Sequence, residues 1–356
     1  MTRIARRVKM VGMVTALRAA ASTIAAVTMI AVVVGSSTAG AAANSENVSS
    51  TPVIIGVPLS PPKVPQLAVY VAENLGFFEK VHLVVTIAYM PTGLQSELGT
   101  TSGSITLGMA AGTDSIEAAA QGAPIHAIWV DYAHLDTVCI ARKTIKTVKN
   151  LIGKNVGSTG AGGFAATTMG ACLAKGGVSA SQVHEITMTR SEFVPSLESG
   201  RISAAVFHAD TSYTILHTVK GAHVLDYEYK SLPTYWYGSL NVTNAYAKKN
   251  PKVVEDAIAA IMAANRWMMK PSNNAKFVKL AVRSTGETEK AVQYAIKFDR
   301  SIKLWNTSCA VSKKSVGFTS RLLLKQGSIT RLPAFSQVYD GKYCSAAKKI
   351  AAKLYR

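Results

Sequence analysis

The sequence has few of the residues from which reactive or metal-holding sites are built. Four cysteines and seven histidines occur in 356 residues, and no two cysteines have the C-x-x-C spacing of a metal site. Ser158, in the glycine-rich segment described below, has no histidine near it in sequence that could activate it as a nucleophile. We therefore expect neither an enzyme nor a protein that holds a cofactor or a metal.

Acidic residues are scarce as well. Asp and Glu number 20 against 39 Lys and Arg, so the formal net charge is +19. Such a surface would be drawn to anionic cell wall, lipid or nucleic acid. The lysines are mostly spread singly, however, and basic residues do not alternate with aromatic ones. We expect no nucleic-acid partner.

Long apolar runs are confined to the N-terminus. Five basic residues precede an apolar run at 19–34, and small residues follow, which is the order of a secretory signal. The run is shorter than the ~20 residues that a spanning helix needs. We predict that residues 1–43 are removed, with cleavage after Ala43 or after Ala41, which lowers the net charge to +14. An uncleaved anchor is the alternative. The pair Arg6-Arg7 hints at export by the twin-arginine route. A lipid anchor is not supported, because there is no cysteine near the cleavage site.

The four cysteines are expected to be structural in an exported protein, because disulfides persist there. Sequence alone allows three pairings. Proximity along the chain favours Cys139–Cys172 and Cys309–Cys344. Free buried thiols are the alternative.

Strands and short helices alternate along the chain, which predicts an α/β protein with parallel-rich sheets covered on both faces. Strands are expected at 52–57, 82–90, 104–110, 125–130, 137–141, 154–157, 184–189, 202–209 and 223–227. Helices are expected between them, and Thr113 and Asp114 are candidates to cap one that continues through residue 120, with Glu117 strengthening the cap. From residue 250 the apolar spacing is helical only, which predicts a helical tail packed on one lobe.

One strand–helix–strand unit recurs about 97 residues along the chain. Residues 103–110 resemble residues 200–207, and Asp114 and Asp210 follow the two segments. A repeat of this kind predicts two lobes of similar build. Chance likeness of one common unit is the alternative.

Residues 157–164 hold four glycines before an expected helix. Glycines let the backbone turn sharply, and a helix start offers unpaired N–H donors, so the segment favours binding of a small anion or polar head group. Two other readings stay open. Gly160-x-Gly162-x-x-Ala165 with Glu185 fits a dinucleotide fingerprint, and the segment could be a plain turn.

Four phrases in this order, at 74–80, 102–125, 154–164 and 197–205, resemble a known family. It is the group of substrate-binding proteins of ABC importers for nitrate, sulfonate, taurine and thiamine-pyrimidine precursors. The resemblance extends over about residues 52–325. It implies a two-lobed periplasmic-binding-protein-like (type II) α/β fold with a helical C-terminal tail. Residues 44–135 plus 236–356 would form lobe 1 and residues 136–235 lobe 2, with crossings near 131–137 and 232–240.

The resemblance also implies a function. The chain would be an exported monomer in the periplasm or cell-wall space that closes its lobes on a small anion and delivers it to the membrane permease of an ABC importer. A binding protein for a flat thiamine-pyrimidine-type precursor, or an enzyme of the related pyrimidine-precursor synthase type, is the alternative.

Loops at the carboxyl ends of the strands would face the cleft in this fold. Apart from Lys63, the matched loops contain no Arg or Lys, so an anion would rest on backbone N–H groups and hydroxyls. Aromatic residues at these loops suit a flat ring or an alkyl chain, or else pack at the hinge. His208 beside Asp210 is the one acid/base pair of interest. The residues expected to bind ligand are Ser60, Gln66, Gly112, Thr113, Asp114, Ser158, Thr159, Gly160, Gly162, Phe164, Asp210, Tyr235 and Trp236.

Overall fold

The computed structural model describes residues 50–160 and 162–355. The predicted secretory signal, residues 1–43 with its cleavage site, lies outside the described residues. Within the described part, no helix combines the length and the apolarity that crossing a membrane requires.

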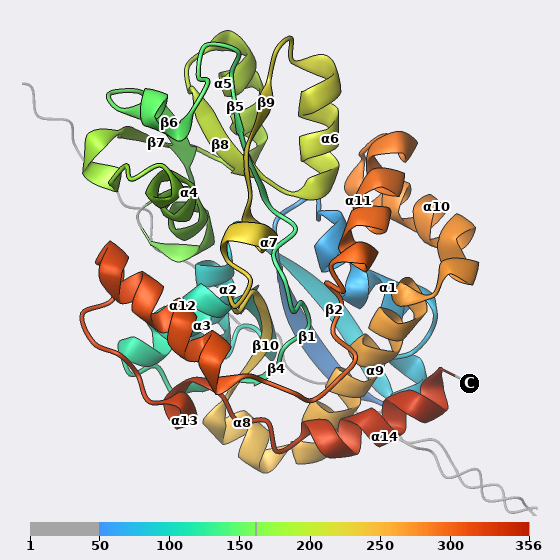
Figure 1. Ribbon diagram of the computed structural model, residues 1–356. Coiled ribbons are helices and arrows are strands. Elements are labelled where there is room, and N and C mark those ends of the chain that lie inside the picture. Colours follow the sequence, from blue (N-terminus) through green and yellow to red (C-terminus); the bar gives the residue numbers. More distant parts are fainter. Residues whose placement is uncertain (1–49, 161, 356) are drawn as a thin grey trace, which may run out of the picture. The chain divides into compact units, whose positions relative to one another are not determined.

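The first lobe is built on a five-stranded mixed sheet of order β2-β1-β3-β10-β4 (Figure 1). β1 is parallel to β2 and β3, whereas β10 runs antiparallel between β3 and β4. The central strand, β3, is buried over its whole length, because its residues meet helices on both faces. The strands are β1 (Thr51–Pro58), β2 (Leu83–Met90), β3 (Leu107–Ala111), β4 (Ile125–Trp129) and β10 (Gly238–Thr243).

The second lobe repeats this arrangement in the order β7-β6-β8-β5-β9. β6 is parallel to β7 and β8, and β5 runs antiparallel between β8 and β9. In each sheet the inserted antiparallel strand, β10 or β5, is the one that follows a crossing from the other lobe. The predicted repeat is confirmed, because β3 and β8 hold the same place. The strands are β5 (Val138–Ala141), β6 (Asn155–Ser158), β7 (His184–Thr187), β8 (Ala204–Phe207) and β9 (His223–Tyr227).

Two sequence-based expectations about the sheets were wrong. Neither sheet is parallel-rich, since two of the four strand pairs in each are antiparallel. β10 was not expected as a strand, because its first residues were assigned to the crossing. Its buried residues Leu240 and Val242 nevertheless point into the core of the first lobe.

Helices cover both sheets and form the C-terminal part of the chain (Figure 1). The first lobe contains α1 (Ala68–Asn74), α2 (Gly93–Ser102) and α3 (Gly112–Ala120), and the second contains α4 (Gly163–Lys175), α5 (Phe193–Ser199), α6 (Ala209–Thr218) and α7 (Glu228–Ser231). The rest are α8 (Asn244–Lys249), α9 (Pro251–Met269), α10 (Asn274–Thr285), α11 (Glu289–Ser301), α12 (Lys313–Gln326), α13 (Phe335–Val338) and α14 (Cys344–Leu354). Short 3-10 turns lie at Val64–Leu67, Glu79–Val81, Val148–Leu151, Ala180–Gln182, Arg190–Glu192 and Pro271–Asn273.

The C-terminal helices contact both lobes, so the expectation that they pack on one lobe was wrong. α9 is the centre of this part, because its small and apolar residues from Ala257 to Ala264 are fully buried against α1 and α14. α11 lies beside α6 of the second lobe (Figure 1). α12 contacts α3 and α4, and Gln326 donates a hydrogen bond from its Nε2 to the Thr167 carbonyl at 3.0 Å.

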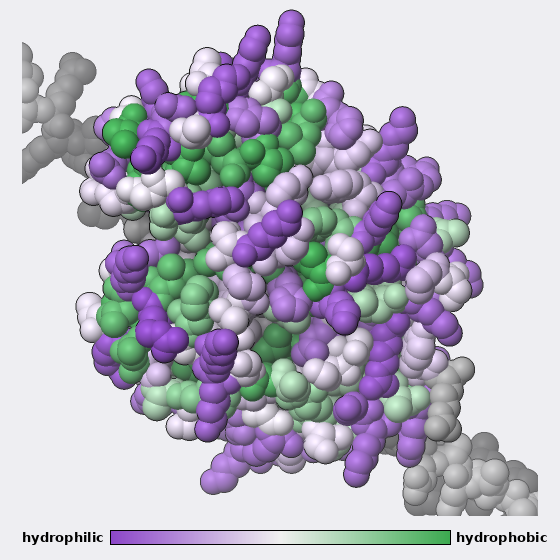
Figure 2. Space-filling view, in the orientation of Figure 1, coloured by the Kyte–Doolittle hydropathy of each residue, from purple (hydrophilic) through white to green (hydrophobic). Residues whose placement is uncertain are grey.

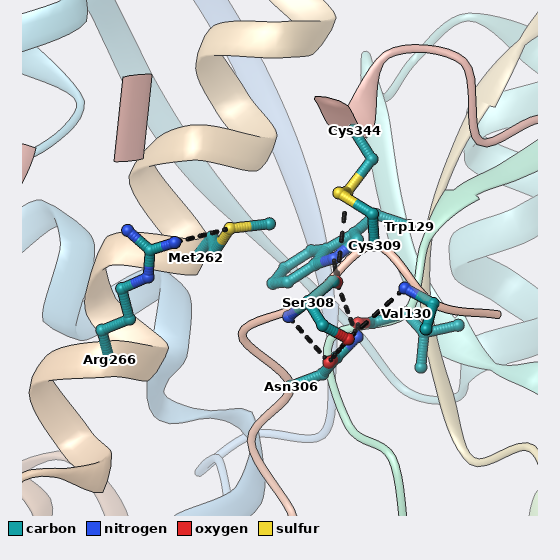
Figure 3. The surroundings of a disulfide bond; sticks show 9 residues. Trp129, Val130, Met262, Arg266, Asn306, Ser308, Cys309 and Cys344 are labelled. Atoms are coloured by element: carbon teal, nitrogen blue, oxygen red, sulfur yellow. Dashed lines mark hydrogen bonds between the residues drawn. A yellow bond between two sulfur atoms is a disulfide. The ribbon is translucent and has the colours of Figure 1, made fainter. Parts of the chain in front are cut away.

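Both predicted disulfides are present. Cys139–Cys172 ties β5 to α4 in the core of the second lobe, and Cys309–Cys344 ties the segment before α12 to the start of α14. Figure 3 shows the second bond beside the Trp129 ring. The Trp129 indole N–H donates to the Ser308 carbonyl at 2.9 Å, which fixes the segment next to Cys309.

Hydrophilic side chains are distributed over the whole face seen in Figure 2 and do not gather on one element. This distribution agrees with the single spacing of the lysines in the sequence.

Candidate functional site

A small cavity lies where the two lobes face each other. We name it the inner cavity; its volume is about 130 Å³. It adjoins a wider space of about 820 Å³, the outer groove, with which it shares lining residues from both lobes. The inner cavity is lined by Pro58, Leu59, Gln66, Pro91, Thr92, Gly93, Leu94, Ala110, Ala111, Asp114, Tyr132, Thr159, Gly162, Gly163, Phe164, Ala165, Arg190, His208 and Tyr237.

The structure brings only part of the predicted site together. Inner-cavity positions are held by Gln66, Asp114, Thr159, Gly162 and Phe164. Ser60 lies in the outer groove, where Thr159 also takes part. The other predicted residues line neither space: Gly112, Thr113, Ser158, Gly160, Asp210, Tyr235 and Trp236.

The glycine-rich segment at residues 157–164 lines the inner cavity from the second lobe. At its end α4 begins, and the backbone N–H group there already has a hydrogen-bond partner within the protein. Gly162 and Gly163 adopt positive φ, +77° and +65°, which favour glycine. The Gly163 N–H donates to both carboxylate oxygens of Glu117 from the first lobe, at 3.0 and 3.3 Å. The sequence predicted that a ligand would bind at the start of α4. The group found there is the Glu117 carboxylate of the protein itself. Burial raises the pKa of Glu117, and this hydrogen bond opposes the rise.

Asp114 is the acidic group of the inner cavity. α3 begins at Gly112 behind Ala111, and the Asp114 Oδ2 accepts the Ala111 N–H at 3.0 Å. Asp114 therefore stabilises the helix start from inside the helix. Burial, and then repulsion by Glu117, raise the pKa of Asp114 to about 7. Of the predicted capping residues, Asp114 is confirmed, whereas Thr113 lies inside the helix behind the N-cap Ala111, and Glu117 binds Gly163 instead.

Arg190 is the cation of the site, and the sequence analysis missed it. It follows β7 and lines both the inner cavity and the outer groove. Its Nη1 donates to the Val206 carbonyl at 3.1 Å, and the guanidinium lies 5.1 Å from the centre of the Phe193 ring. No carboxylate in the described part of the chain forms an ion pair with it. Burial lowers the pKa of Arg190, yet a guanidinium stays charged at neutral pH.

Arg190 could have been identified from its place in the sequence. It follows the carboxyl end of a strand, where the rule for open α/β sheets places ligand contacts. The predicted strand at 184–189 extended two residues beyond Thr187, where β7 ends. For this reason the loop that contains Arg190 was not recognised as a loop facing the cleft.

Aromatic rings form one side of the inner cavity. Phe164 stacks on Tyr237, with ring centres 5.0 Å apart and planes at 16°, and is nearly parallel to His208 at 6.1 Å. By contrast, Tyr235 and Trp236 are buried, each with 2% of its surface exposed. These two rings pack in the interior at the hinge, which was the alternative for the aromatic residues.

His208 is held by Asp136 and not by Asp210. The Asp136 carboxylate lies 3.0 and 3.1 Å from the His208 Nδ1, accepts the Ala209 N–H at 3.1 Å and accepts the Tyr237 hydroxyl at 3.2 Å. This arrangement leaves the Nε2 of His208 as the ring nitrogen without a protein partner in the described part. The interpretation of His208 and Asp210 as a pair was wrong: Asp210 accepts the Val64 N–H at 3.0 Å instead, from the first lobe.

Lys63, the one basic residue expected near the cleft, is neutralised. Its Nζ forms an ion pair with Glu287 at 2.6 Å. Glu287 also accepts hydroxyl hydrogen bonds from Thr211 and Thr214 of α6, at 3.2 and 3.1 Å. Arg190 therefore carries the unpaired positive charge at the inner cavity. Over the described ranges, no three His, Cys, Asp or Glu side chains are placed to hold a metal ion.

The chain matches known proteins over most of its length. The model of the family "NMT1/THI5 like" matches residues 65–275. No curated protein sequence matches significantly.

Solved structures with the same fold include the following three. The alkanesulfonate-binding protein SsuA from Xanthomonas axonopodis pv. citri, bound to MOPS, is 17% identical, with a TM-score of 0.69 over 82% of this chain and 100% of that chain. The periplasmic nitrate-binding protein NrtA from Synechocystis PCC 6803 is 13% identical, with a TM-score of 0.66 over 86% and 89%. A variant of DSZB in complex with biphenyl-2-sulfinic acid is 12% identical, with a TM-score of 0.59 over 84% and 99%. The predicted two-lobed periplasmic-binding-protein fold with C-terminal helices is thereby confirmed.

Proposed function

Because the chain belongs to the NMT1/THI5-like family, we propose that it is an extracytoplasmic solute-binding protein that delivers a small organic anion to an ABC importer. The observation that carries this proposal is the inner cavity between the lobes, with the unpaired Arg190 guanidinium in its wall. A planar guanidinium offers two parallel N–H donors to the oxygens of a sulfonate, carboxylate or nitrate. Structures with this fold include proteins named for binding alkanesulfonate and nitrate.

Both lobes supply groups to the proposed ligand. Arg190, His208 and Phe164 come from the second lobe, whereas Asp114 and the end of β3 come from the first. A ligand that contacts both sets is held best when the lobes are closed, so it shifts the population toward the closed form. We assign lobe 1 to residues 44–135 plus 236–356 and lobe 2 to residues 136–235, with the hinge in the two crossings between them.

Asp114 does not exclude an anion from the cavity. With a pKa of about 7 its carboxyl is largely protonated in mildly acidic medium, and a neutral carboxyl can donate its O–H to an anionic oxygen. Anion binding at this site is then coupled to proton uptake.

Catalysis is less well supported than binding. No Ser or Cys lines the inner cavity among the described residues, and neither of its two threonines, Thr92 and Thr159, forms a hydrogen bond with His208 that could activate it as a nucleophile. A second candidate ligand is a flat nitrogen heterocycle of the thiamine-pyrimidine type. The stacked Phe164 and Tyr237 rings would cover its face, and Asp114 would accept its N–H groups.

Export and assembly belong to the same proposal. We propose cleavage of the signal after Ala43 or Ala41, a monomer, and docking to a membrane permease. N-terminal sequencing of the secreted protein tests the first part, and an intact Met1 would favour an anchor instead.

The ligand itself is identified by native mass spectrometry of protein purified without dialysis. We expect a bound anion, and titration calorimetry with sulfonates, nitrate and an aminopyrimidine then ranks the classes. Tight binding of the aminopyrimidine, with none of any anion, would replace the first candidate by the second.

A further inference from the structure

One side of α12 is exposed and takes no part in the ligand site. The helix lies on the outside of the molecule and packs against α3, α4 and α13 (Figure 1). Its residues Val316, Thr319 and Leu323 are buried against these neighbours. Two leucines at the border of the exposed side are unusually accessible: Leu324 is 38% exposed, and Leu332, in the segment after the helix, is 49% exposed.

Three basic residues form the centre of the exposed side. Lys314, Arg321 and Lys325 follow one another at spacings of seven and four residues, which places them on one side of a helix. All three are exposed, and none forms an ion pair with a carboxylate of the described chain. We name this surface, Lys314, Arg321, Lys325, Leu324 and Leu332, the α12 face.

Acidic residues do not balance the charge of the α12 face. The sequence contains no Asp or Glu between Asp299 and Asp340. Among the helices that α12 packs against, α4 and α13 contain no acidic residue, and the two acids of α3, Asp114 and Glu117, are buried. The α12 face is therefore positively charged at neutral pH and attracts an anionic partner.

We propose that the α12 face docks on the surface of an anionic phospholipid membrane. Leucines beside lysines and an arginine have the chemistry of an interfacial helix: the apolar side chains enter the headgroup region, and the basic ones bind lipid phosphates. A fluid lipid surface adapts to a convex helix, whereas a protein partner would need a matching groove. This docking goes beyond the proposed solute-binding function and does not depend on it.

Co-sedimentation of the secreted protein with vesicles tests this docking. Vesicles of phosphatidylcholine mixed with phosphatidylglycerol should bind the protein, whereas vesicles of phosphatidylcholine alone should not. Binding should weaken as salt is added, because salt screens the charges. Lys314→Gln/Arg321→Gln/Lys325→Gln should weaken the partition at least about tenfold, since each basic residue near an anionic surface contributes roughly a fivefold factor. Leu324→Gln should weaken it roughly two- to fivefold and leave the salt dependence unchanged.

A variant of α10 is the matched control. Lys276→Gln/Lys279→Gln/Arg283→Gln removes the same charge from another exposed helix side, and the partition should stay within about twofold of the wild type. Equal losses in the α10 and α12 variants, with normal thermal melts, would show that overall charge attracts the protein and would overturn the docking of α12. Wild-type protein that binds neither kind of vesicle would overturn it too and leave the α12 face to an acidic protein partner.

Discussion

The Glu117 carboxylate of the first lobe accepts the Gly163 N–H of the second lobe at 3.0 Å, at the start of α4. Two further acids bridge the lobes in the same manner. Asp210 of the second lobe accepts the Val64 N–H, and Glu287 accepts the Thr211 and Thr214 hydroxyls. The arrangement of the two lobes in this structure is therefore stabilised by hydrogen bonds between groups of the protein itself.

Replacing Glu117 tests how much this contact stabilises the fold. Glu117→Ala should lower the free energy of unfolding by about 1.5–3 kcal/mol, the range for a hydrogen bond to a charged group. Glu117→Gln keeps an acceptor and should cost less. Urea denaturation measures both. Glu198→Ala, an exposed acid on α5, is the control. If Glu117→Ala unfolds at the wild-type urea concentration, the contact contributes nothing.

Arg190 should dominate the affinity for an anion. Arg190→Gln removes a charged hydrogen-bond donor that forms no ion pair with a carboxylate in the described part of the chain. Calorimetry should therefore show binding of butane-1-sulfonate about 10- to 100-fold weaker, which corresponds to about 1.5–3 kcal/mol. The matched control is Arg201→Gln. Arg201 is exposed, forms only a long ion pair with Glu192 at 3.8 Å, and lines neither the inner cavity nor the outer groove. Equal effects of the two variants would show that general surface charge attracts the anion.

Anion affinity should rise as the pH falls through about 7. The pKa of Asp114 lies near that value, and a bound anion favours the protonated carboxyl because like charges repel. If only the protonated form binds, the dissociation constant at pH 8 should be about tenfold higher than at pH 6. Calorimetry in two buffers of different ionisation enthalpy measures the proton uptake.

Asp114→Asn provides the comparison for this pH dependence. The amide is neutral at every pH, so most of the dependence should disappear. Identical pH profiles of the variant and the wild type would assign the titration to another group.

Several features of the fold could be predicted because they depend on local pattern. Strand and helix alternation, the repeat around β3 and β8, and both disulfide pairs follow from residue spacing along the chain. β10 was not predicted, because it begins at Gly238, directly after the aromatic residues 235–237, and its first residues were assigned to the crossing at 232–240. Its place between β3 and β4 is set by pairing with strands more than a hundred residues away.

The site was predicted less well, because its contacts cross between the lobes. Glu117 has the spacing of a cap residue within α3, and only the packing of the two lobes against each other brings it to Gly163. Asp136 lies in a crossing, and its bond to His208 depends on where β8 ends in space. Gly162 and Phe164 were found because the loop itself forms the cavity wall.

Stability should decrease as the pH rises from about 4.5 to 8. Burial raises the pKa of Glu97 and of Glu228 to about 8 and that of Asp131 to about 7. The folded state therefore binds more protons than the unfolded chain between pH 4.5 and 8, and the free energy of unfolding falls with pH in that window. Thermal melts should show a melting temperature that falls steadily between pH 4.5 and 8.

Glu97→Gln should reduce this slope. The Glu97 Oε1 accepts the Ser115 hydroxyl at 2.9 Å, and an amide oxygen can take over that bond. Glu289→Gln is the control, since Glu289 is an exposed residue at the start of α11. A melting temperature that rises with pH would mean that these carboxyls are ionised in the folded protein.

The two disulfides should contribute similarly to stability and differently to binding. They close loops of similar length, with sequence separations of 33 and 35 residues, and loop entropy gives about 3–4 kcal/mol for each. The double variants Cys139→Ala/Cys172→Ala and Cys309→Ala/Cys344→Ala should therefore lower the free energy of unfolding by comparable amounts. Urea denaturation of the two secreted variants measures this.

Ligand binding should respond to the first disulfide alone. Cys172 lies on α4, whose first residues Gly163 and Phe164 line the inner cavity, and the bond to Cys139 fixes that helix to β5. Cys309 and Cys344 lie near Trp129, and none of the three lines the inner cavity or the outer groove (Figure 3). Calorimetry with butane-1-sulfonate should show weaker binding in the Cys139/Cys172 variant and wild-type affinity in the other. The same loss in both variants would mean that binding follows overall stability and not the position of α4.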